Sequence, residues 1–343
     1  MSATDPWVVR ALTGFDDPTF GRRQWNGLQA GRTGDGVFLT WEWQSAWWSV
    51  LGRGTLRLLV AEREGQVLAL APLFTESGMV YFVGSGAADY LDFVGDVGMP
   101  GVMEALLAAA CAAVPGFIGF VFYHVPEASP TGALLAQAAE RLGMAWFDEG
   151  GMPAPVLELP DPEAVLRAAG RKSLVRHERF LERHGSLAVV HGRRREEIEP
   201  HLDAFFAQHR ERWQETPHPS LFHDPAQPRF YRALTAAGDG AGWLRFTRVE
   251  WQGRPIAFHF GFCHRGRYLW YKPSFAVDLA RRSPGEVLLR RLLLAAGEEG
   301  AHTFDFGLGD EPFKARFATR VDRVRNWGLY DRRALGTHER PGG

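Results

Sequence analysis

Acidic, basic and glycine residues gather in the segment FDFGLGDEPFK, near the end of the chain. Asp305 falls between two phenylalanines at the end of an apolar run, and Gly307 and Gly309 let the backbone turn closely after it. Asp310 and Lys314 follow. Carboxylates grouped with an ammonium at a strand end are typical of proton transfer, so the segment predicts a catalytic site with Asp305 as its base. A structural role fits the same pattern: Asp305 would cap the turn or pair with Lys314.

Two further groups are candidates for substrate binding. His209 and Trp213 lie in HRERW, which ends a helical pattern, where the helix dipole by itself also favours a histidine or an arginine. Tyr271 and Lys272 lie near the end of the strand pattern YLWYKPSF, and alternation predicts that one of them points to the ligand-binding face of the sheet. Only three of the 39 basic residues are lysines, at 172, 272 and 314, which indicates positions that need a compact ammonium.

The segment RRSPGEVLL predicts a helix start that can hold an anion. Free N–H groups and the dipole at a helix N-terminus attract negative charge, and two arginines precede this start. The residues concerned are Arg281, Arg282, Ser283 and Gly285. An ordinary helix start with proline and glycine is the alternative, because proline is common at the first helical position.

The elements that must position these residues form a clear order in the second half of the chain. Strand patterns at 243–251, 255–264 and 268–275 are separated by short turns and predict an antiparallel meander. A helix at 285–299, a strand around 302–306, a short helix and a last strand follow. A helix is also predicted from Glu196 to Trp213, and the stretch at 215–228 is predicted to be a surface loop that could act as a lid.

The first half is also mixed α/β, with a helix at 41–51 capped by Thr40 and a hairpin after it. The cluster GGMPAP at 150–155 marks a boundary, so we expect domains at 1–155 and 156–343. Asp161 and Pro162 give a helix start signal just after it.

Composition indicates a soluble globular protein with two domains. The chain has 343 residues, 45% of them hydrophobic and 23% charged, and its net charge of -1 excludes a globally basic nucleic-acid binder. Residues 167–195 are locally basic, with nine Arg or Lys against Glu178 and Glu182, which fits either a solvated helix face or a nucleic-acid contact. The sequence shows no signal peptide, no membrane span and no metal-binding signature, and Cys111 and Cys263 are expected to be packing residues. A cytoplasmic location is expected.

The meander followed by a loop and a helix resembles the core of the GCN5-related N-acetyltransferase (GNAT) superfamily. More specifically, the chain resembles the CelD/BcsL group of predicted bacterial acetyltransferases, related to the FemABX peptidyltransferases that carry two such domains in tandem. The segments that carry this resemblance are FLTWEWQSAWW, GQVLALAPL, DYLDF at 89–93, HRERW, RRSPGEVLL and FDFGLGDEPFKARF. The resemblance implies two tandem GNAT-like domains of the acyl-CoA N-acyltransferase fold, the first of them degenerate.

What the resemblance implies about function is transfer of an acyl group, such as acetyl, from acyl-CoA to an amine, on an amino sugar or a cell-envelope or exopolysaccharide precursor. Tyr271 and Lys272 would border the acyl chain, and Asp89, Tyr90 and Asp92 would face the same cleft as His209. The superfamily's glycine-rich pyrophosphate loop is reduced here to Gly285. Two alternatives remain: transfer from aminoacyl-tRNA, with RNA contacts at 167–195, and a non-catalytic scaffold in polysaccharide synthesis.

Overall fold

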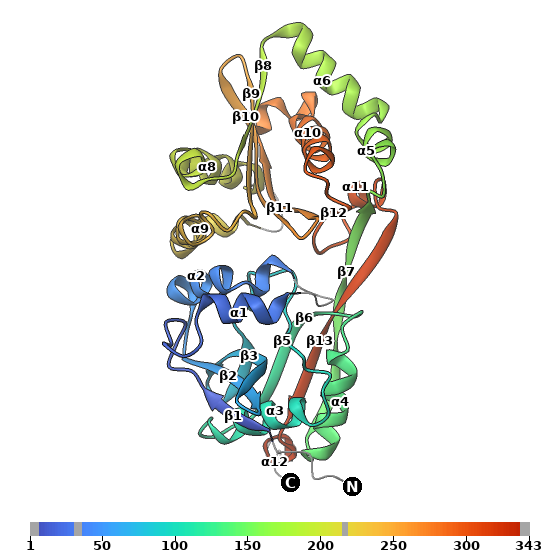
Figure 1. The fold of residues 1–343 in the computed structure, drawn as a ribbon. Coiled ribbons are helices and arrows are strands. Elements are labelled where there is room, and N and C mark those ends of the chain that lie inside the picture. The colour runs from blue at the N-terminus through green and yellow to red at the C-terminus, as the bar shows by residue number, and fades with distance from the viewer. Residues whose placement is uncertain (1–6, 31–35, 215–218, 337–343) are drawn as a thin grey trace, which may run out of the picture. The chain divides into compact units, whose positions relative to one another are not determined.

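The computed structural model describes residues 7–30, 36–214 and 219–336. The chain forms two compact units, drawn in Figure 1. Unit 1 comprises Met1–Pro153 and Asp322–Gly343, and unit 2 comprises Ala154–Val321. The division falls at Pro153, near the expected boundary at 155. The last segment of the chain groups with unit 1 and not with the second half, because its strand pairs with a strand of unit 1.

Unit 1 is a mixed sheet with helices. Its strands run in the order β1-β2-β3-β4-β6-β13-β7, with β5 paired to β3. They are β1 (Val8–Ala11), β2 (Thr55–Arg63), β3 (Gln66–Glu76), β4 (Met79–Phe82), β5 (Val94–Gly95), β6 (Gly119–Pro126), β13 (Arg320–Tyr330) and β7 (Ala145–Glu158), the last of which continues into unit 2. The helices are α1 (Arg22–Gln29), η1 (Val37–Leu39), α2 (Trp41–Leu51), α3 (Val102–Ala112), α4 (Thr131–Arg141) and α12 (Arg332–Gly336).

Unit 2 repeats the mixed architecture. From the end of β7 its strands run in the order β12-β11-β10-β9-β8. They are β8 (Leu187–Gly192), β9 (Leu244–Trp251), β10 (Arg254–His264), β11 (Arg267–Phe275) and β12 (Thr303–Asp305). The helices are α5 (Pro162–Ala169), α6 (Lys172–His184), α7 (Arg195–Ile198), η2 (Glu199–His201), α8 (Leu202–Trp213), η3 (Leu221–His223), α9 (Ala226–Ala237), η4 (Val277–Arg282), α10 (Pro284–Glu298) and α11 (Pro312–Ala315).

The local signals in the sequence are confirmed where they are strongest. Strands β9, β10 and β11 form the expected antiparallel meander. Thr40 caps α2 by accepting from the N–H of Trp43, and Asp161 caps α5 by accepting from the N–H of Ala164. The helix expected over 196–213 is instead broken into α7, η2 and α8. Pro200 lies at the break, where a proline cannot donate a helical hydrogen bond. The predicted loop begins at 215–218, outside the described residues, and continues into η3 and α9.

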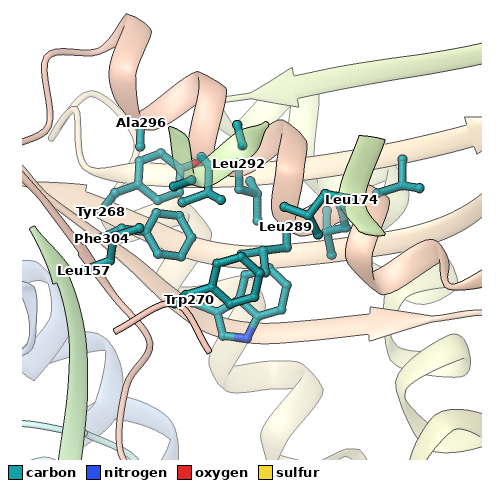
Figure 2. Close-up of a cluster of buried hydrophobic side chains, with 14 of the residues drawn as sticks. Leu157, Leu174, Tyr268, Trp270, Leu289, Leu292, Ala296 and Phe304 are labelled. Atoms are coloured by element: carbon teal, nitrogen blue, oxygen red, sulfur yellow. The ribbon is translucent and has the colours of Figure 1, made fainter. Parts of the chain in front are cut away.

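The core of unit 2 lies between α10 and one face of the meander. Helix α10 buries a continuous apolar face, and Figure 2 shows Leu292 and Ala296 beside the rings of Tyr268 and Phe304, with Leu289 nearer to Trp270. Helix α8 packs on β11, and Figure 1 draws it with α9 on the other side of the meander from α10. The meander is therefore buried on both faces, as expected of an α/β sheet covered by helices. Across the described ranges, no helix is long and apolar enough to cross a membrane.

Candidate functional site

Strands β10 and β11 pair through an irregular register. Phe260 lies opposite Lys272, and Phe262 lies opposite Leu269. The two residues of β11 between Leu269 and Lys272 therefore face the single residue Gly261 of β10. This is a β-bulge in β11, a feature that locally bends a strand and changes the direction of its side chains.

The bulge places Tyr271 and Lys272 on the same face of the sheet. Residues directly opposite in an antiparallel pair share a face, so Lys272 points to the side of Phe260, whose ring packs against Phe205 of α8. Tyr271 points to that side too, since its ring lies 6.4 Å from Tyr231 of α9, and the Lys272 Nζ lies 4.1 Å from the centroid of the Tyr271 ring. The prediction that alternation would send only one of the two there is wrong, because the bulge interrupts the alternation.

His209 of α8 lies near this pair as a buried, neutral imidazole. Its Nδ1 is 2.8 Å from the Ser220 Oγ, and its ring stacks with Trp213 at 5.8 Å between centroids. Burial, and next the positive charge of Lys272, lower the pKa of His209 to about 3. The structure thus gathers His209, Trp213, Tyr271 and Lys272 around the α8 side of β11 in unit 2.

Sequence reasoning missed Ser220. It is the N-cap of η3, where its Oγ accepts from the N–H of Phe222 at 3.2 Å as well as contacting His209. A serine before a short helix is a recognisable capping signal. Its pairing with a histidine of the preceding helix depends on tertiary packing, which no local pattern encodes.

Strand β12 supports β11 over only part of its length. The two strands are parallel from Arg267 opposite Thr303 to Leu269 opposite Asp305, where β12 ends. In the described part of the chain, no other strand pairs with this edge of β11 from Trp270 onward. A strand edge without a strand partner presents N–H and C=O groups that an extended ligand can use.

Asp305 is fully buried at the end of β12, and both of its carboxylate oxygens have partners. Oδ2 lies 2.8 Å from Nη1 of Arg267, and Oδ1 accepts from the N–H of Gly307 at 2.8 Å. The second contact is the turn cap anticipated as a structural alternative. Arg267 was not anticipated, although the parallel register of β11 and β12 brings it two positions from Asp305.

Lys314 and Asp310 have different surroundings. Lys314 is buried, and its Nζ donates to the carbonyl of Leu308 at 2.6 Å and pairs with Glu311 at 2.7 Å. It therefore braces the loop after β12 and does not pair with Asp305. Asp310 is exposed, and no described residue forms an ion pair or hydrogen bond with its carboxylate. Of the three predicted catalytic residues, Asp310 alone has an accessible side chain.

The start of α10 offers few groups to an anion. Pro284 has no N–H, and the N–H of Glu286 bonds to the carbonyl of Ser283 at 3.0 Å, which leaves the N–H of Gly285 in the first turn. The Ser283 side chain makes no capping bond. The Glu286 carboxylate also lies in this turn, where it pairs with Arg316 at 3.3 Å. A phosphate here would rely on side chains more than on the backbone.

Exposed cations lie on α6 and η4, which pack together. Arg282 of η4 lies 4.2 Å over the ring of Phe180, and its carbonyl contacts the His177 Nδ1 at 3.2 Å. We call the exposed cations of these two elements the α6–η4 patch, which consists of Lys172, Arg176, Arg179, Arg183, Arg281 and Arg282. Within the described residues, no carboxylate pairs with any member of this patch. The same two elements also carry two exposed carboxylates, Glu182 and Asp278, which pair with arginines outside the patch, so cations predominate on this surface.

The predicted residues of unit 1 lie around the segment between β4 and β5. Asp92 is buried and accepts hydrogen bonds from the hydroxyls of Ser129 and Thr131, each at 2.6 Å. Burial raises its pKa. Tyr90 contacts Phe38 at 6.2 Å, and Asp89 lies in the same loop. Asp92 therefore has the contacts of a residue that holds this loop, and a cleft shared with His209 stays a prediction.

The described residues contain no group of three or more His, Cys, Asp or Glu side chains that could hold a metal ion. Cys111 and Cys263 are both free thiols, and burial raises the pKa of each to about 11. Neither thiol is therefore an activated nucleophile.

Comparison with known proteins gives the fold and a family for part of the chain. Residues 168–315 match the family described as an acetyltransferase (GNAT) domain. This range holds α6, the α8 residues, the bulged strand, the start of α10 and Asp305. No curated protein matches the chain.

Solved structures similar to the chain extend over nearly its whole length. FemX has a TM-score of 0.68 at 12% identity, covering 93% of this chain and 98% of its own. L-PGS from Bacillus licheniformis has a TM-score of 0.57 at 15% identity, covering 94% and 95%. A tandem GNAT protein from the clavulanic acid biosynthesis pathway has a TM-score of 0.55 at 14% identity, covering 95% and 98%. These findings support the GNAT superfamily, the acyl-CoA N-acyltransferase fold and a FemX-like architecture.

Proposed function

We propose, from the GNAT domain at residues 168–315, that unit 2 transfers an acyl group to an amine that contacts the α8 side of β11. One observation carries this proposal: the bulge of β11 turns Tyr271 and Lys272 to the same face, next to the neutral His209. A cation, an aromatic ring and a neutral imidazole at one place are the groups needed to bind an amine acceptor and polarise a carbonyl.

In this proposal each residue has a distinct role. When the amine attacks the acyl carbonyl, a C–N bond forms and negative charge develops on the carbonyl oxygen. The ammonium of Lys272 stabilises that charge. His209 is buried and neutral, with its Nδ1 on the Ser220 hydroxyl, so it orients the amine, with Trp213 as an apolar wall. The exposed carboxylate of Asp310 takes the proton that the amine loses, and the carrier leaves with the electrons of the broken bond.

Acyl-CoA is the first donor that we propose. The edge of β11 beyond Leu269 suits an extended arm with amide groups, such as the pantetheine arm of CoA, since such an arm can pair with a strand edge. Phosphates would then lie toward Gly285, Arg281 and Arg282, with the side chains supplying most of the attraction because Pro284 lacks an N–H.

Aminoacyl-tRNA is the second donor candidate, and the α6–η4 patch favours it. The patch has six exposed cations and no paired carboxylate among the described residues, which suits a polyphosphate backbone more than one small ligand. The acceptor in both cases is proposed as an amine of a saccharide or cell-envelope precursor, in line with the CelD/BcsL resemblance. A cytoplasmic location belongs to the same proposal, since both donors are cytoplasmic.

Acetyl-CoA titrated by calorimetry tests the first donor, and a gel shift with bulk tRNA at two salt concentrations tests the second. Turnover with the donor that binds is then compared in Lys272→Met and in Arg323→Met, a control that removes an exposed charge on β13. We expect Lys272→Met to lower kcat by about 10²–10³, as loss of one oxyanion donor does, and Arg323→Met to leave it unchanged. If neither donor binds, the catalytic proposal fails and a scaffold role remains.

A further inference from the structure

His259 is a buried histidine that lies at the bulge, on the face of the sheet opposite the proposed site. It pairs with Pro273 in the ladder and is completely inaccessible to solvent. Its Nε2 lies 3.3 Å from the backbone nitrogen of Tyr271, and its ring stacks on Trp270 with 5.5 Å between centroids. The imidazole thus reaches into the irregular part of the ladder, where β10 has one residue and β11 has two.

Gly261 provides the space for this imidazole. A Cβ on Gly261 would lie 2.2 Å from Cε1 and 2.4 Å from Nε2 of His259, and 2.5 Å from the carbonyl oxygen of Leu269. Real Cβ atoms do not approach other atoms so closely. The observed bulge therefore requires glycine at position 261, because a side chain there would clash with the His259 ring.

We infer that His259 is the positioning residue that holds the bulge of β11 and so keeps Tyr271 and Lys272 on one face. The inference rests on the proposed function, to which it adds a residue outside the acceptor site. A bulge leaves an N–H without a strand partner, and orphaned buried N–H groups are rare because they cost free energy. Here Nε2 of His259 accepts the N–H of Tyr271 in place of the missing strand carbonyl.

The imidazole is neutral in this role. Burial lowers the pKa of His259 to about 3, so one ring nitrogen carries a proton and the other has a free lone pair. The ring also hydrogen-bonds the backbone of Leu269, which opposes the fall in its pKa. Accepting from the Tyr271 N–H at Nε2 places the proton on Nδ1, which has no hydrogen-bond partner in the described structure. A buried donor without an acceptor costs free energy, so in this tautomer the bond to Tyr271 must offset that cost.

Nitrogen NMR tests the hydrogen bond directly and needs no substrate. In the wild-type chain we expect a scalar coupling between the amide nitrogen of Tyr271 and Nε2 of His259, and a ring protonated at Nδ1. A ring protonated at Nε2, with no coupling, would overturn the inference.

Two variants test whether the bond holds the bulge. His259→Gln, whose side-chain oxygen can accept the same N–H, should keep the cross-strand NOEs of the wild type, between Phe260 and Lys272 and between Phe262 and Leu269. His259→Phe and Gly261→Ala should each lose one of these two contacts as the strand shifts. Persistence of both contacts in a folded His259→Phe protein would refute the positioning role.

Kinetics give a second, separable outcome. If the proposed function holds, His259→Phe lowers kcat/KM for the acceptor about tenfold or more, His259→Gln restores it, and the effect is not additive with Lys272→Met. Phe258→Leu is the matched control, because it removes buried volume from the same strand on the other face. If no acyl transfer is found with any donor, the proposed function fails while the NMR result still decides whether His259 holds the bulge.

Discussion

Replacing Asp305 with asparagine distinguishes a structural role of this residue from a role as the catalytic base. The carboxylate is fully buried, with Arg267 on one oxygen and the N–H of Gly307 on the other. Asparagine keeps the size of the side chain and one oxygen for the Gly307 bond, but it removes the negative charge that faces Arg267. The contacts argue that Asp305→Asn weakens the fold of unit 2 and does not remove a catalytic base.

The expected loss of stability in Asp305→Asn depends on how far its partner, Arg267, is exposed to solvent. Loss of one member of a buried ion pair costs about 3–5 kcal/mol when the other charge stays buried. Arg267 is 38% exposed, so water can solvate its guanidinium after the substitution, and the cost falls to that of one charged hydrogen bond, about 2 kcal/mol. In a unit of this size 1 kcal/mol shifts Tm by about 2–4 °C, so we expect a decrease of about 4–8 °C.

The assay compares Tm and turnover per folded molecule in Asp305→Asn and in Arg267→Gln. Arg267→Gln should lower Tm more, because it leaves a carboxylate buried without its cation. The double substitution should cost less than the sum of the two. A decrease of 10² or more in turnover with an unchanged Tm would refute this reasoning and restore Asp305 as the base.

Three other predictions concern single groups. His209 and His259 each have a pKa of about 3 in the folded chain, below the unfolded value of about 6.5, so protonation at low pH favours the unfolded chain. Each histidine should therefore lower the free energy of unfolding by about 2 kcal/mol at pH 5, which is measured as a lower Tm than at pH 7. The substitution His259→Gln should remove about half of this difference in Tm. Lys314→Met should lower the free energy of unfolding in urea by about 2 kcal/mol, because the Leu308 carbonyl loses a charged donor. Asp310→Asn should reduce turnover by about 10²–10⁴ with Tm unchanged, and normal turnover would exclude it as the proton acceptor.

The parts of the fold that follow local rules could be predicted from the sequence. The caps Thr40 and Asp161, the meander and the helix after RRSPG depend on short-range hydrogen bonding and on periodicity within one element. The break at Pro200 was missed, although proline is a local signal, because an apolar periodicity continued on both sides of it.

The geometry of the site depends on contacts between elements and was not predictable in the same way. Nothing in YLWYKPSF marks a bulge, since the irregularity arises from Gly261 and His259 on the neighbouring strand. An ion pair of Asp305 with Lys314, nine residues later, was one of the structural alternatives, but the parallel register of β11 and β12 brings Arg267 there instead. Register between strands is set by the packing of the whole sheet, which single-strand patterns do not contain.

Because the start of α10 has few free N–H groups, the salt dependence of binding can distinguish the two proposed acyl donors. A backbone cradle needs several free N–H groups, and Pro284 and the Glu286 contacts leave mainly the N–H of Gly285. Attraction must then come from side chains such as those of the α6–η4 patch. A donor with few phosphates displaces few counterions, so its affinity falls slowly with salt, whereas a polynucleotide that spans the patch displaces many. With six cations in contact, the slope of log K against log salt would approach about -4 for a single-stranded backbone. Charge reversal at Arg176 and Arg179 should flatten a steep slope and change a shallow one little, so the slope identifies the donor class even before the acceptor is known.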